Sequence, residues 1–105
     1  MEWIKIFESG EAARAQVSGA GLLKLSVHEQ RICLALIGTQ LRAFSDRCPH
    51  NGESLSKGKV NYLGEIICPW HGYRYNTQHG QCAEGTGTLG IFPLKESPEG
   101  LFIAI

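Results

Sequence analysis

The chain has 105 residues, of which 43% are hydrophobic and 19% are charged, and its ten Lys and Arg balance ten Asp and Glu. This size fits one domain, and this composition fits a folded core and excludes a disordered chain. The zero net charge, with no run of like charges, argues against a nucleic-acid-binding protein. The longest apolar run, Ile32 to Ile37, is too short to cross a membrane, so we expect no membrane partner.

The N-terminal residues 1–5 lack the basic and apolar regions of a secretory signal, so we expect a cytoplasmic protein. In that compartment, four cysteines near histidines indicate a metal site sooner than two disulfides. Cys33 lies inside the apolar run and is expected in the core, and Cys82 is also expected to pack.

The first half of the chain predicts short strands joined by turns. Strands are expected at Trp3–Phe7, Leu22–Val27, Ile32–Ile37 and Leu41–Ser45. The Ile32–Ile37 segment is continuously apolar, which predicts a central strand covered on both faces. Between the first two strands, Glu8–Ala20 is polar and rich in small residues, and we expect a single helical turn at Glu11–Arg14.

The second half alternates loops with further short strands. Strands are expected at Lys59–Tyr62, Glu65–Cys68, Tyr73–Asn76, Ile91–Lys95 and Leu101–Ile105. Asp46–Lys57 and Pro69–Gly72 have no periodicity and are expected to be loops, and Glu84–Thr88 is expected to be a tight loop. The sum is one all-β domain over residues 1–105, a small antiparallel barrel or sandwich.

Two short boxes carry the chemistry of the chain. They read Cys48-Pro-His50 and Cys68-Pro-Trp-His71, and seventeen residues separate His50 from Cys68. Each box supplies one thiol and one imidazole, both of which are metal ligands. Four such ligands suit a structural zinc ion. Zinc ligands usually come as a Cys pair followed by a His pair, however, whereas one Cys and one His per loop also fits a cluster of two irons.

The boxes and their flanks resemble the Rieske family of [2Fe–2S] proteins. The family pattern is Cys-x-His followed, after a spacer, by Cys-x-x-His, and both boxes match it. Leu41–Arg47 resembles the strand that precedes the first box, and Tyr73–Cys82 resembles the hairpin that follows the second. The resemblance covers essentially the whole chain. It implies a Rieske-type all-β fold in which two loops, within about residues 46–88, bind the cluster, and the loop near Glu84–Thr88 packs over it.

The resemblance also implies the role of each ligand. One [2Fe–2S] cluster would be bound by Cys48 and Cys68 on the inner iron and by His50 and His71 on the outer iron. Electrons would leave through the edges of the imidazole rings.

Departures from the family pattern indicate the branch. Rieske subunits of membrane cytochrome complexes carry an extra cysteine in each box, and Glu53 and Trp70 stand at those positions here. Those subunits also have a serine that donates to a cluster sulfide, and Tyr73 stands at its position here. Only the backbone N–H of Tyr73 is therefore expected to donate. Tyr75 matches the family tyrosine, whose hydroxyl is expected to donate to a cysteine sulfur. This pattern resembles the soluble ferredoxins that serve oxygenases.

The resemblance implies a monomeric electron carrier, itself no enzyme, between a reductase and an acceptor such as a ring-hydroxylating oxygenase. An accessory subunit of a nitrite reductase-like enzyme is the alternative, and a catalytic oxygenase is set aside because 105 residues leave no room for its catalytic domain. Trp70 is expected beside the cluster, and the sequence leaves open whether it packs in the core or meets a partner.

Overall fold

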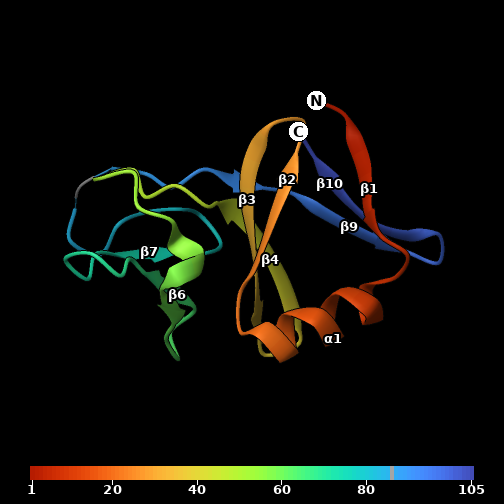
Figure 1. Cartoon of the computed structure of the whole chain (residues 1–105), viewed down its shortest axis with the longest axis horizontal. Coiled ribbons are helices and arrows are strands. Elements are labelled where there is room, and N and C mark those ends of the chain that lie inside the picture. The colour runs from red at the N-terminus through yellow and green to blue at the C-terminus, as the bar shows by residue number, and fades with distance from the viewer. Residues whose placement is uncertain (86) are drawn as a thin grey trace.

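The computed structural model describes residues 1–85 and 87–105, and its described strands form three small antiparallel sheets rather than a closed barrel (Figure 1). The strands are β1 (Trp3–Phe7), β2 (Leu23–Val27), β3 (Gln30–Ile37), β4 (Gln40–Ser45), β5 (Lys59–Val60), β6 (Glu65–Ile67), β7 (Arg74–Asn76), β8 (Ile91–Phe92), β9 (Leu94–Ser97) and β10 (Gly100–Ala104). An α-helix, α1 (Gly10–Ala20), and a 3₁₀ turn, η1 (Leu55–Lys57), complete the described elements. The predicted all-β class is confirmed.

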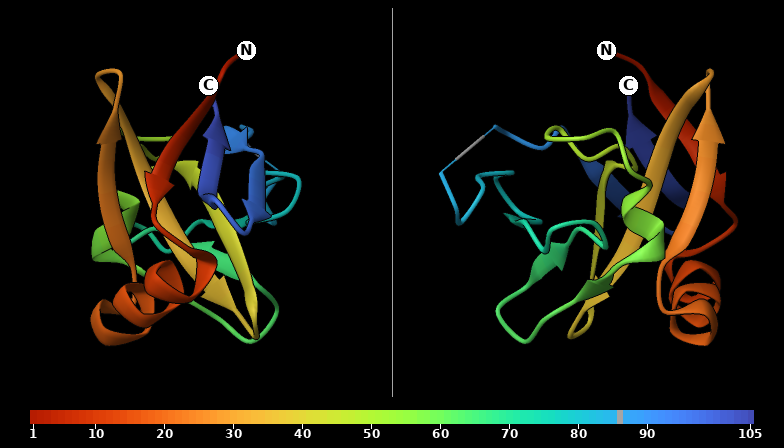
Figure 2. Two further views of the ribbon diagram at one scale, coloured as in Figure 1. Left: turned by 90° about the vertical axis from the view of Figure 1, so that its right-hand side faces the viewer. Right: turned by 60° about the vertical axis from the view of Figure 1, so that its left-hand side comes forward.

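Two of the sheets pack face to face as a sandwich (Figure 2). One has the strand order β1-β10-β9 and the other β2-β3-β4-β8. Their shared core contains Ile32 and Leu34 from β3 and Ile103 from β10, all without exposed surface. The two termini lie side by side because β1 pairs with β10, with Trp3 opposite Ala104.

The helix α1 is longer than the sequence predicts. Residues 10–20 are helical, whereas the sequence predicts a single turn at Glu11–Arg14. Ser9 starts the helix, because its Oγ accepts a backbone N–H of the first turn at 3.0 Å. Ala13 and Val17, four residues apart, are fully buried on one face of α1. This buried face is built of small side chains, which is why its periodicity is weak in the sequence.

The third sheet, β5-β6-β7, forms the other end of the molecule with the loops that bear the two boxes (Figure 1). Ile66 pairs with Tyr75 across β6 and β7, and both residues are fully buried. Cys33 and Ala35 on β3 belong to the same hydrophobic cluster. Since Ile32 and Leu34 face the sandwich, β3 is covered on both faces, as its apolar run predicts. In the described part of the chain, no helix has the length and apolar character needed to span a membrane.

Candidate metal centre

The two Cys/His boxes form loops with the same closure. The backbone N–H of Cys48 donates to the carbonyl of Glu53 at 2.9 Å, and that of Cys68 donates to the carbonyl of Tyr73 at 2.8 Å. In each loop the bond joins residues five positions apart. Each cysteine therefore lies at the base of its loop, and the histidine between the bonded residues lies toward the tip.

Positive φ angles allow both loops to turn tightly. Gly52 and Gly72, each four residues after its cysteine, have φ angles of 78° and 71°. His71 has a φ of 74°, a conformation that few residues with a side chain adopt. Glycine adopts such angles without steric cost, which suits both positions to a tight turn.

The four candidate ligands form two pairs in different environments. The thiols of Cys48 and Cys68 are each 1% exposed. His50 and His71 are exposed, and their ring centroids lie 6.1 Å apart. Among the described residues, no three His, Cys, Asp or Glu side chains converge on one ion. One buried pair of thiols and one exposed pair of imidazoles fit a binuclear iron–sulfur cluster, in which two protein ligands per iron are completed by sulfide.

Hydrogen bonds favour the anionic form of the first cysteine. Burial raises the pKa of Cys48, but donors at its sulfur, which are the Tyr75 hydroxyl and the backbone N–H groups of Asn51 and His50, bring that pKa below its ordinary value. The pKa of Cys68 is raised, mainly by burial and also by the adjacent Cys48. Binding of a metal would deprotonate both thiols.

Tyr75 lies where the resemblance implies. It is fully buried, and its hydroxyl lies 3.5 Å from the Sγ of Cys48. Burial and then the neighbouring sulfur raise the pKa of Tyr75. The phenol thus keeps its proton, and against a Cys48 thiolate, which has no proton to give, Tyr75 would be the donor.

Tyr73 has a contact that the sequence does not reveal. Its ring packs against the ring of His50, with 4.2 Å between the centroids and 30° between the planes. Tyr73 closes the second loop and His50 belongs to the first box, so this contact holds one imidazole against the opposite loop. The strand expected from Tyr73 begins one residue later, at Arg74.

Trp70 is 54% exposed, which shows that the core alternative for this residue is wrong. Its ring lies beside that of His71, with 5.2 Å between the centroids. The exposed indole and the two exposed imidazoles therefore share one surface at the tip of the loops.

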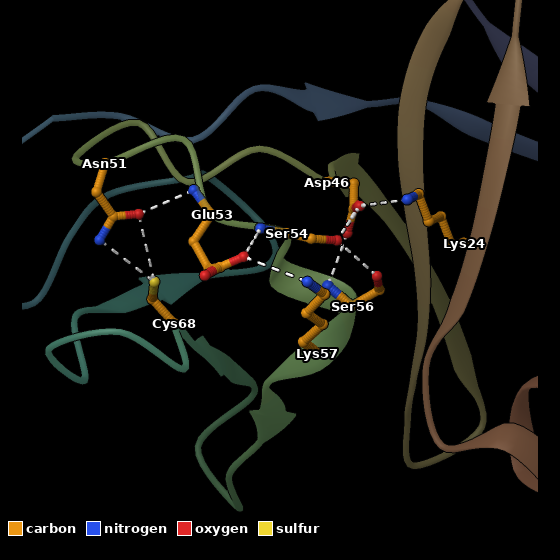
Figure 3. Close-up of polar contacts among 8 residues, drawn as sticks. All are labelled: Lys24, Asp46, Asn51, Glu53, Ser54, Ser56, Lys57 and Cys68. Atoms are coloured by element: carbon orange, nitrogen blue, oxygen red, sulfur yellow. Dashed lines mark hydrogen bonds and ion pairs between the residues drawn. The ribbon is translucent and has the colours of Figure 1, made fainter.

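The base of the first loop is held by Asp46, which has no exposed surface (Figure 3). Its carboxylate accepts the hydroxyl of Ser54 and the backbone N–H of Ser56, the latter at 2.7 Å. Lys24 on β2 places its Nζ 4.0 Å from the same carboxylate. The loop is thus attached to the sandwich through a buried charge.

The predicted loop Glu84–Thr88 contains Thr86, which lies outside the described residues. Glu84 accepts the backbone N–H and the Nε of Arg74, both at 2.9 Å. A Cβ added to Gly87 would lie 3.4 Å from the Cβ of Pro49, so the loop approaches the first box at that point.

Cys33 and Cys82 lie outside the candidate ligand set. Cys33 is fully buried, and burial raises the pKa of its thiol to about 12. Cys82 is half-buried and its Sγ lies 3.6 Å from Glu84.

Asn51, which the sequence pattern does not single out, contacts the second box through its amide. The only sequence signal for it is the turn-forming dipeptide Asn51-Gly52.

Comparison with known proteins shows the family to which the chain belongs. The family model described as the Rieske [2Fe-2S] domain matches residues 2–93. The chain is 32% identical over 80 residues to methylxanthine N1-demethylase NdmA of Pseudomonas putida, covering 76% of this chain and 22% of that protein. It is 28% identical over 108 residues to ferredoxin CarAc of Metapseudomonas resinovorans, covering 97% of this chain and 92% of that ferredoxin.

A solved structure gives the same fold. The ferredoxin of carbazole 1,9a-dioxygenase from Nocardioides aromaticivorans IC177 superposes with a TM-score of 0.81 at 16% identity, over 99% of this chain and 98% of that one. The chain spans about a fifth of the length of the first curated relatives it matches, which are demethylases. The chain belongs to the Rieske [2Fe–2S] domain family, and its cofactor is one Rieske-type [2Fe–2S] cluster.

Proposed function

We propose that Cys48 and Cys68 bind one iron of the cluster, that His50 and His71 bind the other, and that the chain carries single electrons from a reductase to a terminal oxygenase. The bound cluster supplies a one-electron couple. The chain is then a carrier within a multicomponent system and has no catalytic residue of its own.

The observation that supports this proposal best is the contrast between the two ligand pairs. The thiols lie at the base of the loops and are shielded from water, while the imidazoles lie at the tip and are exposed. A partner protein that covers the tip would meet the imidazole edges directly. The distance over which an electron passes between proteins is short in that arrangement, and the thiolates remain protected.

The partner class is proposed from two relatives. CarAc is named a ferredoxin and matches this chain over nearly the full length of both proteins. A solved complex of an oxygenase with a ferredoxin, in carbazole 1,9a-dioxygenase, contains a chain that superposes on this one with a TM-score of 0.72 at 28% identity. A ring-hydroxylating oxygenase is the acceptor that these two observations favour.

Trp70 supports a partner contact at the same tip. An exposed indole beside a ligand histidine is the kind of side chain that is enriched in protein interfaces. We also propose a cytoplasmic location, because two cysteines act as ligands and Cys33 is a buried thiol, which is a use of cysteine typical of a reducing compartment.

The proposal is tested by stopped-flow transfer from the reduced protein to the oxidised oxygenase component of carbazole 1,9a-dioxygenase, followed at the visible bands of the clusters. We expect Trp70→Ala to slow the transfer at least about tenfold without changing the reduction potential, because truncated interface aromatics commonly cost more than 1.4 kcal/mol. Trp3→Ala is the matched control, since Trp3 is 44% exposed but lies on β1 in the sandwich. Failure of the fully reduced wild type to transfer electrons to this oxygenase or to cytochrome c would contradict the carrier role.

A further inference from the structure

The side-chain amide of Asn51 joins the two loops (Figure 3). Its Oδ1 accepts the backbone N–H of Glu53, within its own loop, at 2.9 Å. Both of its polar atoms lie 3.9 Å from the Sγ of Cys68, in the second loop, and its Nδ2 also lies 3.4 Å from the carbonyl oxygen of Trp70. One half-buried side chain thus contacts both loops.

The bond to Glu53 fixes which way the amide points. A backbone N–H needs an acceptor, so the amide oxygen must be the atom at Glu53 and the amide nitrogen the atom at the Trp70 carbonyl, while both atoms lie within reach of the Cys68 sulfur. The NH₂ group has two hydrogens, and the second loop offers two acceptors. A thiolate bound to iron has no proton to donate to Oδ1, so of the two amide atoms only Nδ2 can bond to it, and Cys68 would be the acceptor.

The backbone that positions Asn51 is itself anchored. The carboxylate of Glu53 accepts the backbone N–H of Ser54 at 2.9 Å and lies 3.7 Å from the Nζ of Lys57. Ser54 in turn donates its hydroxyl to the buried Asp46. A continuous set of polar contacts therefore runs from the base of the first loop to the amide of Asn51. These contacts hold the Nδ2 donor in place before the cluster is reduced.

The two candidate thiolates are each provided with one side-chain donor. The hydroxyl of Tyr75 lies beside the Sγ of Cys48, and the amide of Asn51 lies beside the Sγ of Cys68. Hydrogen bonds to cluster sulfurs raise a reduction potential, because they stabilise the reduced state, which is more negative. We propose that Asn51 is a positioning residue of the cluster site, which donates through Nδ2 to the Cys68 sulfur, raises the reduction potential and holds the second loop against the first. This inference rests on the ligand assignment proposed above.

The test compares the reduction potentials of purified, cluster-containing variants by voltammetry. Asn51→Ala removes both donors, and Asn51→Asp removes them while keeping the Oδ1 acceptor for Glu53 and adding a charge. Asn76→Asp is the matched control. It makes the same change of charge at an asparagine whose Oδ1 also accepts backbone N–H groups, from Gln78 at 2.8 Å and His79 at 3.1 Å.

We expect Asn51→Ala to lower the equilibrium constant for reduction about three- to tenfold, and a tenfold change corresponds to about 59 mV for a one-electron couple. Asn51→Asp should lower it further, while Asn76→Asp should change it less than about twofold, a shift under about 18 mV. The iron–sulfur stretching bands of the cysteine ligands in the resonance Raman spectrum should shift in the Asn51 variants alone.

Equal potentials in the wild type and both Asn51 variants, at full iron and sulfide content, would overturn the inference and leave the proposed function intact. If both Asn51 variants lose the cluster, Asn51 only closes the loops, and its proposed effect on the potential is wrong. If the wild type itself binds no iron or sulfide, the ligand assignment fails first, and the inference fails with it.

Discussion

Replacing Tyr75 with Phe tests the hydrogen bonding around the cluster in the most controlled way. The change removes one oxygen and keeps the buried ring that packs opposite Ile66. What is lost is the donor 3.5 Å from the Sγ of Cys48. Because the volume of the side chain hardly changes, the hydrophobic core around it is expected to stay packed, and the free energy of unfolding to change by about 1 kcal/mol or less.

The expected size of the effect follows from that single bond. A hydrogen bond to a charged acceptor contributes about 1.5–3 kcal/mol. Part of this bond is present in both oxidation states of the cluster, so we take about one third to one half of it as the difference between them. For a one-electron couple, in which 1.4 kcal/mol corresponds to about 59 mV, the potential of Tyr75→Phe should fall by about 20–60 mV.

The assay is protein-film or solution voltammetry at neutral pH, with Tyr73→Phe as the control. The ring of Tyr73 packs on His50, and its hydroxyl donates to no cysteine among the described residues, so its loss should shift the potential by less than about 15 mV. The wild-type potential itself should lie low in the class range of about −150 to +300 mV, because no serine hydroxyl stands at the Tyr73 position. An unchanged potential in Tyr75→Phe, or a wild-type value near the top of that range, would refute the reasoning.

Three further variants address the scaffold. Asp46→Ala should lower the free energy of unfolding by about 2–5 kcal/mol in urea titrations, because it leaves buried donors without an acceptor, and a loss below about 1 kcal/mol would contradict that role. Cys33→Ala should destabilise the fold while leaving the visible cluster spectrum unchanged, and a bleached spectrum would show that this thiol is needed at the site. Glu96 is paired with Arg14 at 2.9 Å, which lowers the pKa of Glu96, so the stabilisation by this pair is complete above the ordinary carboxyl pKa and is lost as the pH falls through the lowered value. Unfolding curves of Glu96→Gln should therefore differ from the wild type at neutral pH and converge with it in acid, and a difference that persists at low pH would refute the ion-pair account.

The sequence predicts strands well where the apolar pattern is strong. The run from Ile32 to Ile37 predicts a central strand covered on both faces, and β3 is packed on both. The helix α1 is underestimated, because its buried residues Ala13 and Val17 are too small to produce a clear amphipathic signal. Its length depends on the cap at Ser9 and on packing against the sandwich, which a local pattern does not encode.

At the site, the sequence identifies groups with distinctive chemistry and misses those that act through contact. Cys48 and His50 stand out because their spacing suits a metal ligand pair, but no spacing reveals that Tyr73 packs on His50 or that Asn51 reaches Cys68. Both contacts cross from one loop to the other, so they exist only after the two loops have folded together. For the same reason the exposure of Trp70 follows from the path of its loop and not from its neighbours in the sequence.

The ligand assignment is tested most directly by electron–nuclear double resonance on the reduced protein labelled with ¹⁵N-histidine. The account predicts two distinct nitrogen couplings, from His50 and His71, on a single reduced [2Fe–2S] cluster, and predicts that His71→Cys loses one of them. A cluster signal without any histidine nitrogen coupling, or a colourless protein with one zinc ion and no paramagnetic signal, would contradict it.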